Sequence, residues 1–499
     1  MSSLKSFSTL NGFVVIGYLT AIAVIGISFY RRKTTPKEYF LGGRLISWIP
    51  AGISIIAADL SAITIMGVPA WSFQHNLELV WLSAGYPLMA PIVLTIFIPF
   101  YTSLNLYTAY EYLERRFSLN VRLLTSILFQ IQRAVHVAIV IYAPALVLKL
   151  LTGLPLWECI LLTGALTTVY TTLGGMKAVI YTDILQFLTV MAGLTLIFFS
   201  TIKHVHGGLE AVYQIARNHG RLRLFNLSTS PNQLTSLWSC VLGGSVLSLA
   251  ALISDQAILQ RLFTVRSAKD CKRSIILQAI VIMPVALLLN LVGVGLFAFY
   301  YRHPSSLGKL TSTDAILPFF AVHELLPGIS GLVVAAIFAA SMAVMSAGIN
   351  ALTTATTVDI YQRVINPGKA PEHYASVGRI GTLIWGLVVT LLALFAKDLG
   401  ELIFAYPRVS SFIAGPLLGI FLLGIVTKRA TAGGVLVGAS ASLALVCFAS
   451  FFTRWSFFYL CAMGFGVTFA MGYLASLFQA PPPVEKTRGL VWNSGAERR

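Results

Sequence analysis

The stretch WIPAGISIIAADLSAITIMGVPAWSF, residues 48–73, determines the fold class of this chain. It is long enough to cross a lipid bilayer, because a membrane-spanning helix needs about 20 mostly apolar residues. Asp59 lies near its middle, among residues such as Gly52, Gly67 and Pro69 that weaken or interrupt a helix. A carboxylate at this depth is costly unless it faces a partner or a hydrated cavity, so Asp59 predicts a functional site.

The composition indicates a polytopic membrane protein. Of the 499 residues, 57% are hydrophobic and only 11% are charged, whereas about 25% of the residues in a soluble domain are charged. The net charge of +17 does not indicate a nucleic-acid partner, because the positive residues lie between apolar stretches and orient them in the membrane. The expected partners are the lipid bilayer and a small-molecule solute.

The apolar stretches predict an all-α fold with about thirteen transmembrane helices. Their approximate cores are 11–30, 47–72, 79–101, 121–148, 156–173, 178–201, 235–260, 274–300, 328–358, 378–396, 401–426, 431–452 and 456–478. Arg31, Arg32 and Lys33 follow the first stretch, which predicts an N-terminus outside. An odd number of spans then puts the Pro-rich tail, 479–499, in the cytoplasm as a disordered segment. The compact loops favour the inner cell membrane of a bacterium.

The chain divides into two halves that each open with a Gly-interrupted span carrying an acid, Asp59 in the first and Asp255 in the second. Such inverted five-helix repeats place substrate and ion at the midplane of a secondary transporter. The expected units are an N-terminal helix and cytoplasmic loop (1–45), a first repeat (46–201), an extracytoplasmic loop (202–234), a second repeat (235–430), two C-terminal helices (431–478) and the tail (479–499).

Five segments, in order and spacing, resemble the sodium/solute symporter family: EYFLGGR (38–44), AYEYLERRF (109–117), GGMKAVIYTDILQ (174–186), SDQAILQR (254–261) and GPLLGIFLLGIVTKRA (415–430). The resemblance covers roughly residues 11–478. It implies a broken-helix inverted-repeat fold and sodium-driven uptake of a small polar solute. AITIMGVPA and INALTTATTVDIY look nearest the branch that carries monocarboxylates, vitamins and iodide.

The resemblance also implies a sodium site. In the family, two carbonyls from the broken first core helix and a carbonyl plus two hydroxyls from the eighth hold the ion. The matching residues are Ala57, Leu60, Ala340, Ala343 and Val344. The last two occupy the hydroxyl positions and offer no side-chain oxygen, although a hard cation prefers oxygen ligands. The usual sodium site is therefore expected to be weakened or absent.

Three alternatives remain for the coupling ion, of which sodium is favoured. Asp59 could add a carboxylate beside the two carbonyls. The additional site of the family survives in part as Asp183 and Ser346, although Ala347 replaces its second hydroxyl. The coupling ion could also be a proton, carried by a buried carboxylate. The structural alternative for Asp183 is an acid bonded to nearby helix ends.

The substrate prediction depends on Arg133 and His136, three residues apart and so on one helical face, and on Arg408. Arginine is well shaped for a bidentate grip on a carboxylate, and sialic-acid carriers of the family resemble this arrangement. With Asp59 and Asp255, these residues predict a site for an organic anion, either a monocarboxylate or an acidic sugar. The alternatives are internal salt bridges, Asp59 with Arg133 or Arg408 and Arg133 with Asp59 or Asp255, and a packed neutral His136.

Other classes of function fit less well. The sequence has no phosphate-cradling loop, HExxH or GxSxG motif, so neither an enzyme nor an enzymatic cofactor is expected. Ala343 and Val344 leave open a proton-coupled carrier or an uncoupled facilitative carrier. A transporter-like solute sensor is the remaining alternative, but the tail is too short for a signalling domain. Nothing in the sequence predicts the oligomeric state.

Overall fold

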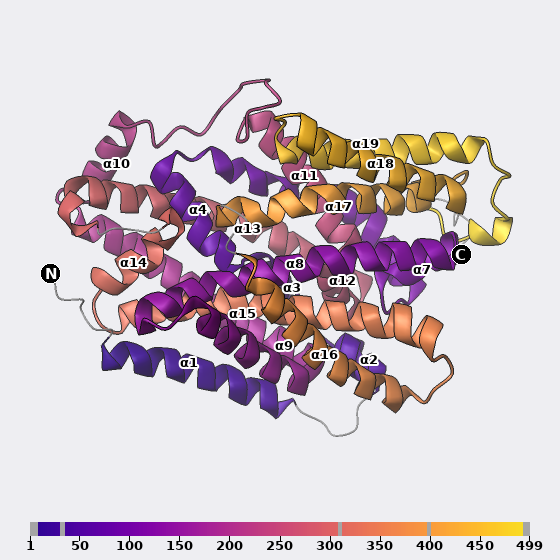
Figure 1. Ribbon diagram of the computed structural model, residues 1–499, viewed down its shortest axis with the longest axis horizontal. Helices are drawn as coiled ribbons and strands as arrows, with labels where there is room; N and C mark the ends of the chain where they lie inside the picture. Colours follow the sequence, from indigo (N-terminus) through magenta and orange to yellow (C-terminus); the bar gives the residue numbers. More distant parts are fainter. Residues whose placement is uncertain (1–7, 30–34, 308–311, 397–400, 493–499) are drawn as a thin grey trace.

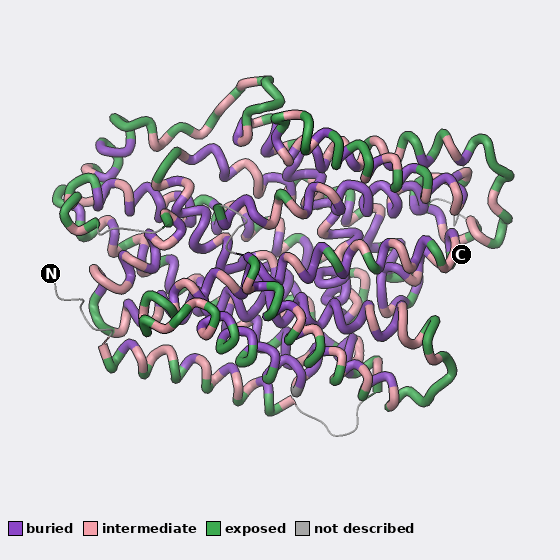
Figure 2. Tube along the Cα trace, viewed as in Figure 1, coloured by how far each residue is buried: buried purple, intermediate pink, exposed green. Residues whose placement is uncertain are grey.

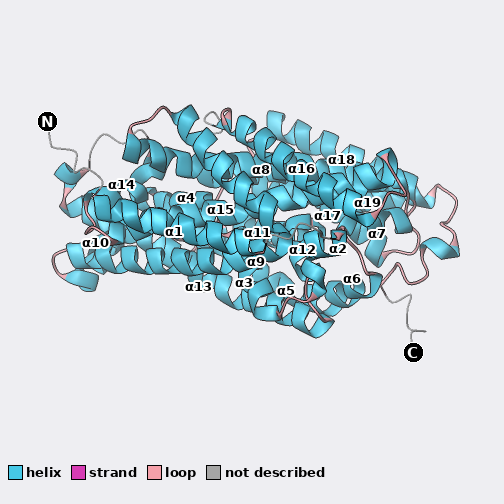
Figure 3. Cartoon of the chain, turned by 90° about the horizontal axis from the view of Figure 1, so that it is seen from below, coloured by secondary structure: helices cyan, strands magenta, loops and turns pink. Residues whose placement is uncertain are grey.

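The computed structural model describes residues 8–29, 35–307, 312–396 and 401–492. Among these residues helices dominate and no strand is present beyond one isolated bridge between Ile46 and Val265, as Figure 3 shows. The expected all-α class is therefore confirmed. Arg31, Arg32 and Lys33, on which the predicted orientation depends, and the end of the tail, 493–499, lie outside the described residues.

The long helices run roughly along the longest axis of the molecule (Figure 1). The α-helices are α1 (Thr9–Ser28), α2 (Pro36–Leu41), α3 (Trp48–Asp59), α4 (Ala62–Gln74), α5 (Gly85–Ile92), α6 (Ile98–Leu104), α7 (Ala109–Arg116), α8 (Leu119–Thr152), α9 (Leu156–His204), α10 (Gly208–Asn218), α11 (Leu237–Ser254), α12 (Gln256–Phe263), α13 (Ala268–Arg302), α14 (Ile316–His323), α15 (Ile329–Ala355), α16 (Pro371–Ala393), α17 (Leu402–Val426), α18 (Ala432–Phe452) and α19 (Phe457–Leu477). Among the shorter elements, a 3-10 helix η2 (Glu78–Ala84) precedes α5, and a π-helix η6 (Thr356–Ile365) continues α15.

Eleven helices of the described chain are long and apolar enough to cross a membrane, and the bent pair α3 and α4 raises the number to twelve. The expected count of thirteen is not confirmed. The difference lies in the first part of α9: Gly174–His204 counts as a span, whereas the stretch 156–173, which was expected as a span of its own, is not among the helices that qualify. The two stretches are nevertheless separate helices, because Gly175 has a non-helical backbone conformation and joins them across a kink. Gly175 adopts φ 59°, which only glycine accepts readily, so the chain turns without a connecting loop.

The core is built around α15, which packs against α1, α8, α9 and α16 (Figures 1 and 2). Nearly all of its residues are buried, and many are Ala, Ser or Gly, so neighbouring helices approach it closely. Exposed side chains on the outer helices are large and apolar, for example Phe13 on α1 and Leu387 on α16. This distribution is typical of a bundle surrounded by lipid.

The first interrupted helix is bent by 56° between α3 and α4. Ser61 caps α4 by accepting a hydrogen bond from the Thr64 backbone N–H, and the Ser61 N–H donates to the Asp59 carbonyl. These bonds replace the regular helical pattern across the break. Within the described chain, the carbonyl oxygens of Ala57 and Leu60 are therefore left without a backbone donor.

The second interrupted helix breaks at Asp255, between α11 and α12, and two of its carbonyls accept hydrogen bonds from tyrosine hydroxyls. The Tyr101 hydroxyl donates to the Ile253 carbonyl at 2.6 Å, and the Tyr110 hydroxyl donates to the Ser254 carbonyl at 3.0 Å. The Asp255 side chain caps α12. Both halves thus open with an interrupted helix, whereas the boundaries of the two five-helix repeats, 46–201 and 235–430, stay a prediction.

An ion-pair network joins α7, α8 and η6 at one end of the bundle. The Glu114 carboxylate accepts hydrogen bonds from Arg122 at 2.8 Å and from Arg363 at 2.6 Å, and Arg122 also pairs with Asp359. Partial burial acts to raise the pKa of Glu114, but the bonds from Arg363 and Arg122 outweigh it and lower that pKa below its ordinary value.

We expect Glu114→Gln to lower the thermal stability of the purified protein at neutral pH and to remove part of its acid sensitivity. A lowered folded-state pKa contributes stability above the unfolded-state pKa, about 4.3, and this contribution is lost as the pH falls through the folded-state value. The gap in Tm between the two proteins should therefore narrow as the pH falls below the unfolded-state pKa, and close once the pH is below the lowered folded-state pKa. Glu372→Gln, an exposed acid on α16, is the control and should show no such gap at any pH.

Candidate functional site

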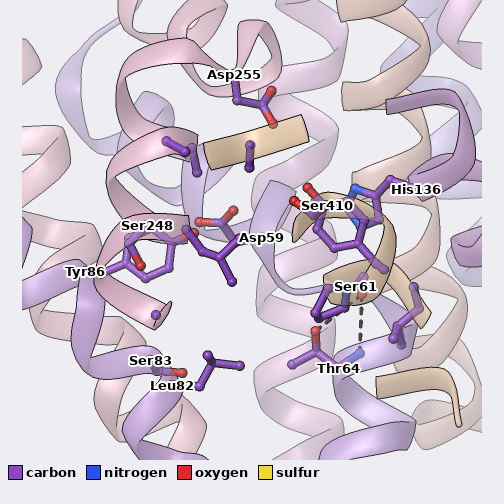
Figure 4. Close-up of a pocket in the computed structure, with 18 of the residues that line it drawn as sticks. Asp59, Ser61, Thr64, Leu82, Ser83, Tyr86, His136, Ser248, Asp255 and Ser410 are labelled. Carbon is purple, nitrogen blue, oxygen red and sulfur yellow. Dashed lines mark hydrogen bonds between the residues drawn. The ribbon is translucent and has the colours of Figure 1, made fainter. Parts of the chain in front are cut away.

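A cavity of about 240 Å³ lies between the two interrupted helices. It is lined by residues of both breaks, with further residues from η2, α5, α8, α13 and α17 (Figure 4). Its polar lining consists of Asp59, Ser61, Thr64, Ser83, Tyr86, Gln132, Arg133, His136, Ser248, Ser254, Asp255, Asn290, Tyr406 and Ser410. A largely apolar pocket with a few convergent polar groups is the usual form of a small-molecule site.

Asp59 is the last residue of α3, and its carboxylate opens partly onto the cavity. Its Oδ2 accepts a hydrogen bond from the Gln278 amide of α13, and Tyr86 lies beside it (Figure 4). No cationic side chain lies within ion-pair distance among the described residues. The alternative in which Asp59 pairs with Arg133 or Arg408 is therefore not what the structure shows.

Arg133, by contrast, has an internal partner. Its guanidinium forms an ion pair with Asp255, and its other terminal nitrogen lies 3.0 Å from Nδ1 of His136. The His136 ring stacks on Tyr406, with ring centroids 3.7 Å apart. Gln132 donates to Ser410 at 2.7 Å and thereby fixes the same wall of α17. The sequence-predicted residues Arg133, His136 and Asp255 are thus brought together on one side of the cavity.

Arg408 is not brought into the site, which corrects its expected position. It is exposed on α17, whereas Tyr406, Pro407 and Ser410 line the cavity. One residue advances a helix by about 100°, and this step carries Arg408 off the face that its neighbours present. That Pro407 lines the cavity therefore does not place the side chain of Arg408 there.

The residues expected to hold sodium gather at a separate, narrow space beside the first break. Ala57, Leu60, Ala340 and Ala343 line it, together with Gln186 of α9. Gln186 is fully buried, and among the described residues neither its Oε1 nor its Nε2 has a partner at regular hydrogen-bond geometry, although Tyr18 and Tyr170 lie beside it. Val344 is buried in α15 but does not line this space.

Asp183 and Ser346 have other partners. Oδ2 of Asp183 accepts hydrogen bonds from the Arg261 guanidinium at 2.9 Å and from the Ser54 hydroxyl. This pair ties α9 to α12 and α3, and it compensates the charge of Asp183. The Ser346 hydroxyl donates to the Ala343 carbonyl. The structural alternative for Asp183, an acid bonded to neighbouring helices, agrees with this arrangement, and a second sodium site stays a prediction.

Gln186, Gln278, Tyr86 and Tyr406 are site residues that the sequence analysis missed. The two glutamines could have been predicted from the sequence, because a neutral polar side chain inside an apolar span is costly to bury without a partner. Gln186 follows Asp183 by three residues and so lies on a neighbouring part of the same helix. The two tyrosines carry no such signal, because tyrosines are common throughout this chain.

A helical bundle whose two interrupted helices enclose a solute-sized cavity is the architecture of a secondary transporter. The sequence comparison agrees with this class: a sequence model of the sodium:solute symporter family matches residues 39–441. The chain belongs to the sodium:solute symporter family.

Relatives in this family cover nearly the whole chain. The sodium/sialic acid symporter NanT of Aliivibrio fischeri is 33% identical over 480 residues, which are 95% of this chain and 94% of the relative. The human sodium-coupled monocarboxylate transporter 1 is 30% identical over 438 residues, 87% of this chain and 72% of the relative. The solved structure of a Na⁺-coupled sialic acid symporter in a substrate-bound outward-open state matches with a TM-score of 0.90 at 30% identity, over 95% of this chain and 99% of that one. This chain is therefore a multi-pass, sodium-coupled solute symporter and not an enzyme.

Two glycines allow α5 and α11 to meet behind the cavity. A Cβ at Gly85 would lie 2.2 Å from the Gly244 carbonyl oxygen, and backbone cannot yield as a flexible side chain does. We expect Gly85→Ala to destabilise the protein by about 1–3 kcal/mol through overpacking, measured as a fall in Tm in detergent.

Gly466→Ala on α19 is the matched control, because a Cβ there meets nothing within 4 Å. Its Tm should be unchanged or slightly raised, since alanine is the better helix former. Equal effects of the two substitutions would contradict the close packing of α5 on α11.

Proposed function

We propose that this symporter takes up a small organic acid together with sodium, and that Arg133 binds the carboxylate of that solute. The observation that carries the proposal is a buried guanidinium on the wall of a solute-sized cavity. Arginine offers a carboxylate two parallel hydrogen bonds. The names of two relatives, a sialic acid symporter and a monocarboxylate transporter, specify carboxylate-bearing solutes and support the same class.

The ion pair of Arg133 with Asp255 gives solute binding a route to conformational change. Asp255 sits at the break between α11 and α12, whereas Arg133 belongs to α8. A solute carboxylate that takes over the guanidinium releases Asp255 and loosens the link between these helices. A ligand shifts a conformational equilibrium only through such a difference in its interactions with the two states.

Sodium is the proposed coupling ion, held by the Ala57 and Leu60 carbonyls and by Oε1 of Gln186. The two carbonyls lack backbone donors, and the amide lacks any hydrogen bond. Oxygen ligands suit a hard cation, so Gln186 supplies what Ala343 and Val344 do not. None of these groups titrates in the physiological range, which favours sodium over a proton at this position.

The proposed arrangement in the membrane follows the sequence-based topology. The N-terminus lies outside and the C-terminal tail in the cytoplasm of the cell that carries the protein in its inner membrane. The two five-helix units, 46–201 and 235–430, rock about the cavity between their interrupted helices, as inverted repeats do in secondary transporters.

The carboxylate site is tested by sodium-driven uptake into proteoliposomes from a defined mixture of small carboxylates, amines and neutral sugars, quantified by mass spectrometry. We expect carboxylates to accumulate, and Arg133→Ala to raise their apparent KM at least tenfold, which corresponds to about 1.4 kcal/mol. Arg408→Ala is the matched control, since Arg408 lies outside the cavity, and it should leave KM unchanged. Equal KM values for Arg133→Ala and the wild type would exclude this role.

The ion site is tested without a solute, by comparing the Tm in NaCl and in KCl. Sodium that binds the folded state raises its Tm, and we expect Gln186→Leu to lose most of that rise. Its Tm in KCl should not fall, because the amide makes no hydrogen bond that leucine would remove. If Gln186 were instead a structural partner of Tyr18 and Tyr170, the substitution would lower the Tm equally in both salts.

A further inference from the structure

The acids inside the spans share a pattern that Asp59 breaks. Asp183 pairs with Arg261 at 2.9 Å, Asp359 pairs with Arg122 at 2.6 Å, and Asp255 pairs with Arg133. An ionised carboxylate away from water needs such a partner. Among the described residues, Asp59 has only the Gln278 amide and Tyr86 beside it, and its carboxylate opens onto the cavity.

We propose that the solute itself supplies the missing cation: it carries a positively charged group that binds Asp59, in addition to the carboxylate that binds Arg133. The solute is then a zwitterion, such as an amino acid or a betaine. This inference rests on the proposed function, because it needs the Arg133 end of the cavity to hold the carboxylate.

The balance of charge in the cavity favours a zwitterion. The acidic and basic side chains that line it are Asp59, Asp255 and Arg133, which sum to one negative charge when Asp59 is ionised. A monoanion would add a second negative charge in a poorly solvated space, where like charges repel strongly. A zwitterion leaves the sum unchanged and offers a partner to each end of the cavity.

The surroundings of Asp59 point the same way. The carboxylate lies at the C-terminal end of α3, where the helix dipole adds partial negative charge. The Tyr86 ring on the cavity wall can also contact a cation through its face. His136 lies apart from Asp59 and Tyr86 in the close-up (Figure 4), and the Arg133 guanidinium contacts His136. Among the described residues, Arg133 forms its ion pair with Asp255 and none with Asp59.

Asp59 does not line the narrow space proposed for sodium. That space is formed by Ala57, Leu60 and Gln186 where α3 faces α9 and α15, whereas the Asp59 carboxylate meets Gln278 of α13. The proposed sodium position and the proposed position of the solute's cationic group are therefore distinct. The Asp59→Asn variant should affect solute binding and leave sodium binding unchanged.

The test is uptake by wild-type proteoliposomes with an inward sodium gradient. The mixture contains L-proline, L-alanine, γ-aminobutyrate and glycine betaine as zwitterions, cyclopentanecarboxylate, propionate, lactate and N-acetylneuraminate as acids without a cationic group, and choline and glucose. We expect at least one zwitterion to accumulate at least tenfold above every acid that lacks a cationic group. An acid of the second group that accumulates equally overturns the zwitterion and leaves the proposed function standing. If no carboxylate-bearing solute accumulates, both fail.

Asp59→Asn provides the second measurement, with Asp270→Asn, a surface acid at the start of α13, as the matched control. We expect the apparent KM for the best zwitterion to rise at least tenfold in Asp59→Asn only, while the rise of Tm in NaCl over KCl is kept. If Asp59→Asn abolishes that rise and leaves KM unchanged, Asp59 is an ion ligand and the inference is wrong.

Discussion

Every backbone carbonyl inside a bilayer needs a hydrogen-bond donor, and the two interrupted helices meet this constraint in different ways. At the second break, the Tyr101 and Tyr110 hydroxyls of α6 and α7 donate hydrogen bonds to the carbonyls of Ile253 and Ser254. At the first break no such donor reaches Ala57 or Leu60 in the described chain. The tyrosine hydroxyls thus occupy two carbonyls of the second break, whereas the carbonyls of Ala57 and Leu60 at the first break stay available to a cation.

Arginine–carboxylate pairs hold the interior together around these breaks. Arg261 with Asp183 joins α12 to α9, Arg133 with Asp255 joins α8 to the break before α12, and Arg122 with Asp359 joins α8 to η6. Buried pairs of this kind contribute little net stability, because desolvation offsets their attraction. Their value here is geometric, since each pair fixes one element against another. The pair at the cavity is the one that a solute can reach.

Much of the fold was predictable from the sequence, because composition and apolar length are local properties of the chain. The all-helical class and the breaks at Asp59 and Asp255 follow from glycines and acids in apolar spans. The site was predictable only in part, since pairs such as Arg133 with Asp255 join residues 122 positions apart. Arg408 was expected in the cavity but lies exposed on α17. Gln186 was missed because its place beside Ala57 and Leu60 depends on the packing of α9 against α3.

The surplus negative charge of the cavity has a consequence for energetics. A charge that moves through the whole transmembrane potential exchanges about 2.3 kcal/mol per 100 mV. If the α3 break moves as the proposed carrier changes its accessibility, an ionised Asp59 takes one uncompensated charge through part of the electric field when the cavity is empty. The membrane potential then acts on the return of the empty carrier. Because the three arginine–carboxylate pairs are each neutral overall, this voltage dependence would come from Asp59.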